Sequence, residues 1–150
     1  MKVFVTGAAG FLGSHLADAF IAGNHSVSGC DNMIGGDLHN LPECIELEQA
    51  DCSDVPAMKR LTTDVDIIFH CAAIATEGLS VFSPALIAQH VYQNTAGILA
   101  AAATNKIKRF VNCSKVLASA VLRFSRCFSW EGDRPSTIAL RASMQRSRAI

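Results

Sequence analysis

Three glycines at a regular spacing follow the first apolar run of the sequence. Gly7, Gly10 and Gly13 come directly after residues 2–5, a run typical of a buried strand. Glycine at these positions allows a tight turn, a close approach of the backbone to a ligand, and close packing of the next helix. The N–H groups and the dipole of a first helical turn bind anions. The loop therefore predicts a binding site for a dinucleotide pyrophosphate, with the spacing G-x-x-G-x-x-G instead of G-x-G-x-x-G.

An acidic residue follows the next predicted strand. Residues 11–22 have the apolar periodicity of a helix, and residues 26–30 are the strand after it. That strand ends in Asp31, eighteen residues beyond Gly13. A carboxylate there accepts both hydroxyls of an adenosine ribose and repels a 2′-phosphate, which favours NAD over NADP. The alternative is that Asp31 and Asn32 only begin a turn.

Length and composition fit one globular domain. The chain has 150 residues, of which 50% are hydrophobic and 17% charged, enough to bury an ordinary core. No apolar run reaches membrane-spanning length, and Met1 and Lys2 lead directly into the first strand, so we expect no signal peptide and no membrane anchor. The six cysteines are scattered without a C-x-x-C pair or a Cys/His cluster. This pattern favours reduced thiols in a cytoplasmic protein and no metal site.

The charges are unevenly distributed although the net charge is zero. Residues 1–103 contain eleven of the thirteen acids and only three of the thirteen cations, whereas residues 104–150 contain the other ten cations. A basic half can indicate binding to nucleic acid. These cations are dispersed, without interleaved aromatic residues and without a helix-turn-helix pattern. We therefore expect no nucleic-acid partner.

Strands and helices alternate along the middle of the chain. Further strands are predicted over residues 43–48, 66–70 and 108–113, with helices over residues 54–61 and 84–103. Repeated β-α units with right-handed crossovers predict an α/β fold. We expect a doubly wound, Rossmann-like parallel sheet of about five to six strands. His70 ends the apolar strand over residues 66–70, a place where a core histidine is commoner than a catalytic one.

Five stretches of the chain share their order and spacing with a known family. They are residues 5–15, 31–36, 49–52, 66–73 and 107–111. In these stretches the chain resembles the extended short-chain dehydrogenase/reductases, specifically the NAD-dependent epimerase/dehydratase group that acts on nucleotide sugars. The resemblance covers residues 1 to about 114. It implies NAD as the cofactor and a nucleotide sugar as the substrate.

The resemblance also implies which residues bind NAD. They are Gly7, Gly10, Phe11 and Leu12 for the pyrophosphate, Asp31 and Asn32 for the adenosine ribose, Asp51 and Cys52 for adenine, and Cys71, Ala72 and Ala73 for the nicotinamide ribose. The carboxylate of Asp51 would accept the exocyclic amine of adenine, and the N–H of Cys52 would reach a ring nitrogen. The residues under the nicotinamide ribose must be small, because a bulky side chain would collide with the cofactor.

The catalytic residues of the family are where this sequence departs from it. Family members transfer a proton with a Tyr-x-x-x-Lys pair and a serine or threonine beyond the fifth strand. Tyr92 is the single tyrosine, and Ala96 stands where the lysine would be. Counting back from residues 108–110 predicts that the family's helix asparagine is replaced by Val91 and that Asn94 takes the place of a glycine.

Two alignments of the C-terminal part are open. Without a gap, Ser114 is the nearest equivalent of the catalytic hydroxyl, and the residues after it are divergent. With a deletion of about thirty residues, an estimate from the resemblance, Lys115 takes the place of the catalytic lysine and Val111 that of the tyrosine. Residues 134–141 would then match the family's sixth strand. The gapless alignment needs fewer events and is preferred.

The end of the chain is expected to differ from the family. We predict an NAD-binding domain over residues 1–130, a divergent and frayed tail over residues 131–150, and no substrate lobe. Residues 116–130 place Val116, Ala120, Phe124 and Phe128 in one row of a predicted helix. An uncovered apolar row of this kind favours self-association, so we expect a homo-oligomer formed through this helix.

Three functions remain open from the sequence. The first is the NAD-binding domain of a nucleotide-sugar epimerase/dehydratase-type oxidoreductase that is incomplete for catalysis. The second is an active NAD-dependent epimerase or dehydrogenase in which Ser114, Lys115 or a partner subunit supplies the acid and base. The third is a non-catalytic interaction protein that uses the C-terminal helix for docking.

Overall fold

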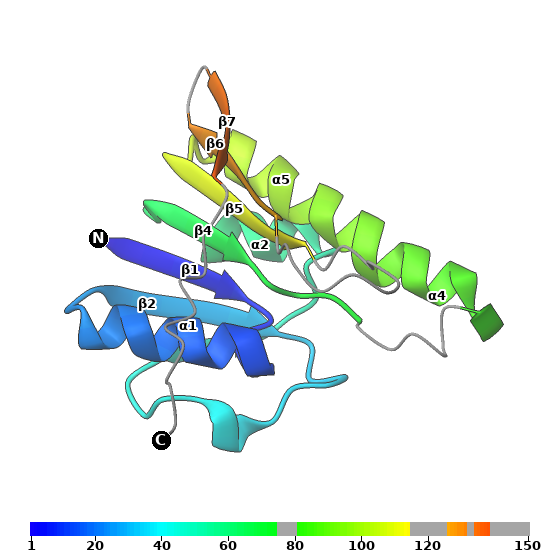
Figure 1. Ribbon diagram of the computed structural model, residues 1–150, viewed down its shortest axis with the longest axis horizontal. Coiled ribbons are helices and arrows are strands. Elements are labelled where there is room, and N and C mark those ends of the chain that lie inside the picture. The colour runs from blue at the N-terminus through cyan, green and yellow to red at the C-terminus, as the bar shows by residue number, and fades with distance from the viewer. Residues whose placement is uncertain (75–80, 115–125, 132–133, 139–150) are drawn as a thin grey trace, which may run out of the picture.

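Seven strands form a single sheet in the computed structural model, which describes residues 1–74, 81–114, 126–131 and 134–138 (Figure 1). The strand order is β3-β2-β1-β4-β5-β6-β7. The strands are β1 (Lys2–Thr6), β2 (Ser26–Asp31), β3 (Glu46–Gln49), β4 (Ile67–His70), β5 (Arg109–Ser114), β6 (Arg126–Glu131) and β7 (Arg134–Ile138). The first five are parallel, whereas β6 and β7 are antiparallel to their neighbours.

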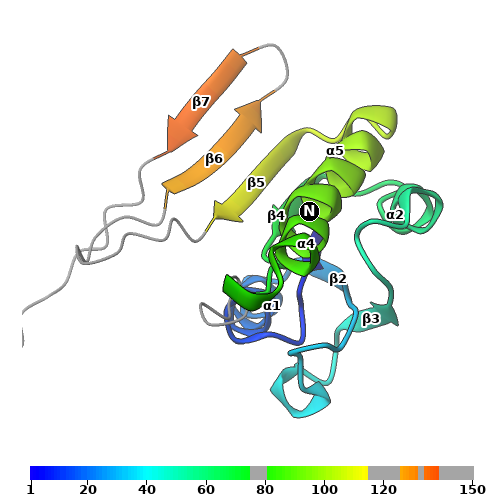
Figure 2. The ribbon, with the colours of Figure 1, turned by 90° about the vertical axis from the view of Figure 1, so that its right-hand side faces the viewer.

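Helices cover both faces of the parallel strands, as Figures 1 and 2 show. The helical elements are α1 (Phe11–Ala22), η1 (Leu38–Asn40), α2 (Val55–Leu61), α4 (Pro84–Ala88), η2 (Gln89–Gln93) and α5 (Asn94–Thr104). Helix α1 lies on one face, and α2 and α5 lie on the other. This arrangement confirms the predicted doubly wound, Rossmann-like α/β fold.

The central strand β1 shows why the strands are apolar on both sides. Val3 and Val5 pack with Ala17 of α1, whereas Phe4 between them packs with Met58 of α2 and Ile98 of α5. A strand covered by helices on both faces has no side that can remain polar. These two clusters are the core, and they fix the helices to the sheet.

The long helix predicted over residues 84–103 consists of three consecutive elements. Helix α4 leads into the π-helical turn η2, and η2 leads into α5. Gly97 presses α5 against the loop after β3, because a Cβ at this position would lie 2.2 Å from the carbonyl oxygen of Cys52. Only glycine allows this approach, and it holds the helix beside that loop.

Strand β6 corrects the prediction of a helix over residues 116–130. Residues 126–131 pair antiparallel with β5, from Arg109 opposite Glu131 to Ser114 opposite Arg126. The free edge of β5 offers unpaired backbone N–H and C=O groups, and pairing them outweighs the helical periodicity of the side chains. The predicted docking helix is therefore wrong for residues 126–130, and residues 116–125 lie outside the described part.

Strand β7 also differs from the expected fraying of the tail. Residues 134–138 form a strand that pairs with β6, within the segment that the gapped alignment predicted as a strand. The sheet thus has seven strands, one more than the upper estimate of six. The domain boundary at residue 130 remains a prediction, as does the end of the chain from residue 139 onward, which lies outside the described residues.

Within the described residues, none of the helices is both long enough and apolar enough to span a lipid bilayer.

Candidate functional site

A cavity of about 850 Å³ opens at the carboxyl ends of the parallel strands. Its lining comes from the loops after β1, β2, β3 and β4, from α1 and from the η2–α5 segment. It lies where the chain order reverses between β1 and β4. In doubly wound sheets this switch point is the usual place for a ligand, and the volume suits a small molecule or cofactor.

The glycine loop lies at one side of this cavity, as the sequence predicts. Gly7 has a φ of 66°, and a Cβ on Gly13 would lie 2.1 Å from the carbonyl oxygen of Gly7. Helix α1 therefore begins directly against the turn. Gly10 is its N-cap residue, and no side chain caps the helix. The N–H groups of its first turn are thus left for an anion. Phe11 and Leu12 line the cavity beside them.

Asp31 lies at the cavity and is joined to the glycine loop. Its Oδ2 accepts a hydrogen bond of 3.0 Å from the N–H of Ala9, and its Oδ1 accepts one of 2.8 Å from the N–H of Met33. The residue is 7% exposed and is part of the cavity lining. The carboxylate therefore faces the loop instead of pointing away from it, as the predicted ribose contact requires.

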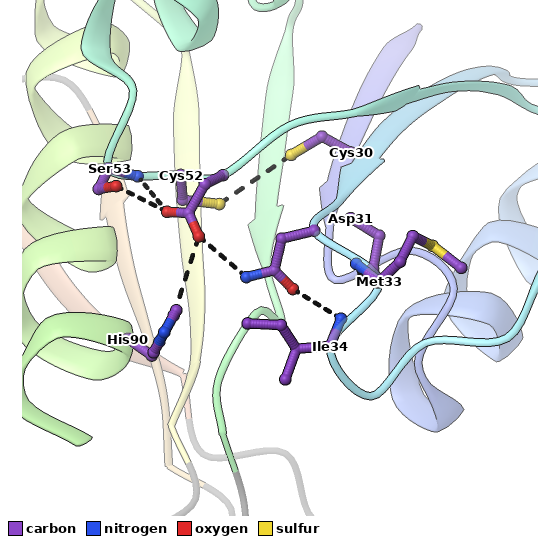
Figure 3. Close-up of polar contacts among 9 residues, drawn as sticks. Cys30, Asp31, Met33, Ile34, Cys52, Ser53 and His90 are labelled. Atoms are coloured by element: carbon purple, nitrogen blue, oxygen red, sulfur yellow. Dashed lines mark hydrogen bonds and ion pairs between the residues drawn. The ribbon is translucent and has the colours of Figure 1, made fainter. Parts of the chain in front are cut away.

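Asp51 forms a polar network with Ser53 of its own loop, Asn32 of the loop after β2 and His90 of η2 (Figure 3). Its Oδ2 accepts a 2.9 Å bond from Asn32, and its Oδ1 accepts bonds of 2.9 and 2.7 Å from the N–H and hydroxyl of Ser53. Partial burial acts to raise the pKa of Asp51, but the donors Asn32 and Ser53 outweigh it, so the pKa is lowered. The carboxylate is thus held ionised. Asn32 and Cys52 line the cavity, whereas Asp51 is not among the lining residues.

Two buried cysteines lie beside this network. The Sγ atoms of Cys30 and Cys52 are 4.0 Å apart, and both residues line the cavity (Figure 3). The hydrogen bond from Cys30 lowers the pKa of Cys52 against the effect of burial, with His70 acting in the same direction. The same contact and burial raise the pKa of Cys30. Cys52 is therefore the more acidic thiol of the pair.

His70 is a core residue with both ring nitrogens engaged. It is 2% exposed. Its Nδ1 lies 2.7 Å from the hydroxyl of Thr6, and its Nε2 lies 3.1 Å from the hydroxyl of Thr95. The sequence interpretation of His70 as a satisfied core histidine is confirmed.

The loop after β4 and the end of β5 form the other side of the cavity. Cys71, Ala72 and Ala73 line it, as do Val111 and Cys113. Ser114 is the last residue of β5, and Lys115 lies outside the described residues. The assignment of these two residues to catalysis therefore stays a prediction.

Among the cavity residues that the sequence did not single out for binding are two buried polar ones. His90 of η2 and Asn94 of α5 follow each other by four residues, line the cavity and are 7% and 3% exposed. Within the described part, the Nδ1 of His90 and the Oδ1 of Asn94 have no hydrogen-bond partner. The sequence did contain one signal for Asn94, which lies three residues before Gly97. Gly97 holds this part of the helix against Cys52, and Cys52 lines the cavity.

Comparison with known proteins is consistent with this geometry. Residues 3–117 match the model of the NAD dependent epimerase/dehydratase family. The chain belongs to this family. It is 32% identical over 120 residues to the UDP-glucose 4-epimerase of Mycolicibacterium smegmatis, an alignment that covers 76% of this chain and 38% of that protein.

Two solved structures of UDP-glucose 4-epimerases are also similar to this epimerase/dehydratase-family chain. UDP-glucose 4-epimerase from Thermotoga maritima, crystallised with UDP-glucose, superposes with a TM-score of 0.76 at 26% identity, over 93% of this chain and 46% of that one. UDP-glucose-4-epimerase from Stenotrophomonas maltophila, with bound NAD and formylated UDP-arabinopyranose, gives 0.73 at 26% identity, over 77% and 37%. The chain thus spans less than half of each relative.

Counting from the fifth strand predicted Val91 at the place of the family's helix asparagine. Val91 is absent from the cavity lining, whereas Asn94 is part of it. Tyr92, also in η2, is 74% exposed.

Proposed function

We propose that this chain is the NAD-binding portion of a nucleotide-sugar epimerase/dehydratase and that it lacks the family's proton-transfer pair. The observation that carries the proposal is the joint position of the uncapped start of α1 and the carboxylate of Asp31 at one cavity. The start of α1 is a site for an anion, and the carboxylate of Asp31 is an acceptor for ribose hydroxyls. The hydrogen bond from Ala9 to Asp31 holds the two together, and this pair suits the adenosine diphosphate half of NAD.

The contacts to the pyrophosphate and the ribose follow from this geometry. The loop of Gly7 and Gly10 and the first turn at Phe11 and Leu12 would hold the diphosphate. Each oxygen of Asp31 already accepts one backbone bond. Since a carboxylate oxygen has two lone pairs, each keeps one for a ribose hydroxyl. Asn32 would lie beside the same ribose.

The bases would occupy the two sides of the cavity. Adenine would lie toward Cys52, whose N–H can reach a ring nitrogen, with the ionised Asp51 behind it. The nicotinamide ribose would pass over Cys71, Ala72 and Ala73, whose small side chains leave room for it.

NAD, when bound, supplies an acceptor for hydride from a sugar carbon. The residues of this chain bind and orient the dinucleotide, and orientation alone accounts for part of enzymatic rate enhancement. The proton of the sugar hydroxyl needs a base, and the sequence contains no Tyr-x-x-x-Lys. We therefore propose binding of NAD without appreciable turnover. Turnover with Ser114, Lys115 or a partner subunit as the source of the base is the alternative.

Calorimetric titration with NAD and with NADP tests the proposal. We expect saturable heat with NAD and weaker binding of NADP, since Asp31 would repel a 2′-phosphate. NAD at about 100 times its dissociation constant should stabilise the fold by about 2.7 kcal/mol in a thermal melt. Absence of both heat and stabilisation would overturn the proposal.

A further inference from the structure

Two buried thiols lie in contact at the cavity, and neither sulfur atom takes part in the proposed binding of NAD. The Sγ atom of Cys30, near the end of β2, lies 4.0 Å from the Sγ atom of Cys52 in the loop after β3 (Figure 3). Both residues line the cavity. The proposed contact of Cys52 with adenine uses its backbone N–H, which leaves the sulfur atoms without a function. Thiols that lie this close together can be joined by oxidation.

The two sulfur atoms differ in exposure and in acidity. Cys30 is 0% exposed, and its Sγ also lies 4.0 Å from the Sδ atom of Met58. Cys52 is 3% exposed, and the hydrogen bond from Cys30 lowers its pKa to about 6. The thiolate is the nucleophile in thiol chemistry. A small reagent that enters the cavity therefore meets Cys52 in its reactive form, with the thiol of Cys30 in contact with it.

We propose that Cys52 and Cys30 are a redox-active dithiol that a small hydroperoxide, such as hydrogen peroxide, converts into a disulfide. In the first step the Cys52 thiolate attacks one oxygen of the peroxide. An S–O bond forms, the O–O bond breaks and hydroxide leaves, so Cys52 becomes a sulfenic acid. In the second step the sulfur of Cys30 attacks that of Cys52. The S–S bond forms, the S–O bond breaks, and the proton of Cys30 leaves with the oxygen as water. The two thiols together lose two electrons, which the peroxide gains.

The disulfide would shift residues that lie next to the proposed NAD contacts. An S–S bond is about 2.05 Å long, so the two sulfur atoms have to approach each other by about 2 Å. Cys30 belongs to a strand that is paired on both sides, with β1 and with β3. Cys52 lies in a loop, so we expect Cys52 to move more. Its neighbour in the sequence is Asp51, which is assigned to adenine. The oxidised chain should therefore bind NAD more weakly, a consequence that rests on the proposed function, whereas disulfide formation itself does not.

Peptide mapping after oxidation tests the proposal. The reduced chain would be incubated with hydrogen peroxide, its remaining thiols alkylated, and its non-reduced peptides identified by mass spectrometry. Cys30→Ser and Cys52→Ser each remove one sulfur atom of the pair. Cys44→Ser is the matched control, because Cys44 is exposed and is absent from the cavity lining.

The wild-type chain and Cys44→Ser should form a disulfide between Cys30 and Cys52 that dithiothreitol reverses. Cys30→Ser should stop at the sulfenic acid of Cys52, which dimedone traps, and Cys52→Ser should leave Cys30 as a free thiol. The proposal would be overturned by an oxidised wild-type chain in which both thiols of the pair are still alkylated, or in which disulfides join other cysteines instead. Mapping of the wild-type chain alone decides between these outcomes if a serine variant fails to fold.

Calorimetry with NAD separates this proposal from the proposed function. The oxidised wild-type chain should bind NAD about tenfold more weakly than the reduced chain, the ratio that a difference of 1.4 kcal/mol gives, and dithiothreitol should restore the affinity. Equal affinities of the two forms would overturn the link between the disulfide and the NAD site. Failure of the reduced chain to bind NAD would instead overturn the proposed function, and the mapped disulfide would still support the dithiol.

Discussion

Asp31 at the end of β2 accepts a 3.0 Å hydrogen bond from the backbone N–H of Ala9 in the glycine loop. The bond joins residues that are 22 positions apart in the sequence. It fixes the distance between the two sites that a dinucleotide needs, one for the diphosphate and one for the ribose. The carboxylate therefore has a structural role in the loop before any cofactor is bound.

Replacing Asp31 tests both of these roles. Asp31→Asn keeps one acceptor oxygen, so one of the two N–H groups of Ala9 and Met33 loses its partner. We expect a loss of about 1–3 kcal/mol in the free energy of unfolding. NAD affinity should fall about tenfold, and the preference over NADP should shrink because the charge is gone. Denaturant titration and calorimetry measure these changes.

The matched control for this variant is Asp18→Asn, which removes the same charge from an exposed position of α1. It should leave both stability and NAD affinity within the range of ordinary surface substitutions. If the two variants behaved alike, Asp31 would have neither role.

A methyl group on Gly13 should separate α1 from the glycine loop. A Cβ there would meet the backbone of Gly7 at 2.1 Å, and backbone atoms cannot move aside as a flexible side chain can. We expect Gly13→Ala to lose at least about 1–3 kcal/mol of stability and to lose NAD binding. Gly35→Ala is the control for stability, because a Cβ at Gly35 has no atom within 4 Å. Equal melting temperatures for the two variants would contradict the expected packing.

The sequence predicted the part of the fold in which local pattern and tertiary packing agree. The apolar run of β1, the glycine loop and Asp31 are all recognisable from short stretches, because each position has one dominant physical requirement. The expected strand over residues 43–48 was placed less well, since β3 spans Glu46–Gln49. Its side chains are exposed or half-buried, so the period of the apolar residues is weak.

The parts that the sequence did not predict depend on contacts between distant segments. Strand β6 forms because the edge of β5 is free, and its own side chains favoured a helix. His90 and Asn94 lie four residues apart on the buried face of the η2–α5 segment. That face meets the cavity only through the packing of the helix against the loop after β3, which the alanine-rich sequence of the helix does not reveal.

Cys52 should be the first of the buried pair to react with an alkylating reagent. Its lowered pKa, about 6, means that the thiolate forms as the pH rises through that value and predominates at neutral pH. The pKa of Cys30 is raised, so Cys30 stays protonated and slow over the same range. We expect the alkylation rate at Cys52 to reach its plateau at lower pH than that of an ordinary thiol. Peptide mass spectrometry of samples alkylated between about pH 5 and 9 measures this.

Bound NAD should protect the same cysteine, since Cys52 lines the cavity. The exposed Cys44 is the internal control, and its labelling should not change with NAD. Protection of both cysteines would indicate a general loss of reagent, and protection of neither would place the dinucleotide elsewhere.

Hydride transfer from a sugar carbon to NAD would leave the proton of the sugar hydroxyl behind. In the proposed complex NAD accepts hydride, but the proton of the sugar hydroxyl has no tyrosine to receive it, because Tyr92 is exposed and outside the cavity. General-base catalysis contributes about 10²–10⁴-fold to rate, so we expect UDP- and GDP-sugars to give NADH at no more than a trace rate. Absorbance at the NADH band measures this for the wild-type chain, Ser114→Ala and Lys115→Ala. Equal traces in all three fit a chain that binds NAD without the pair. A rate that falls in Lys115→Ala while NAD affinity stays constant would instead assign the base to Lys115 and favour the active enzyme.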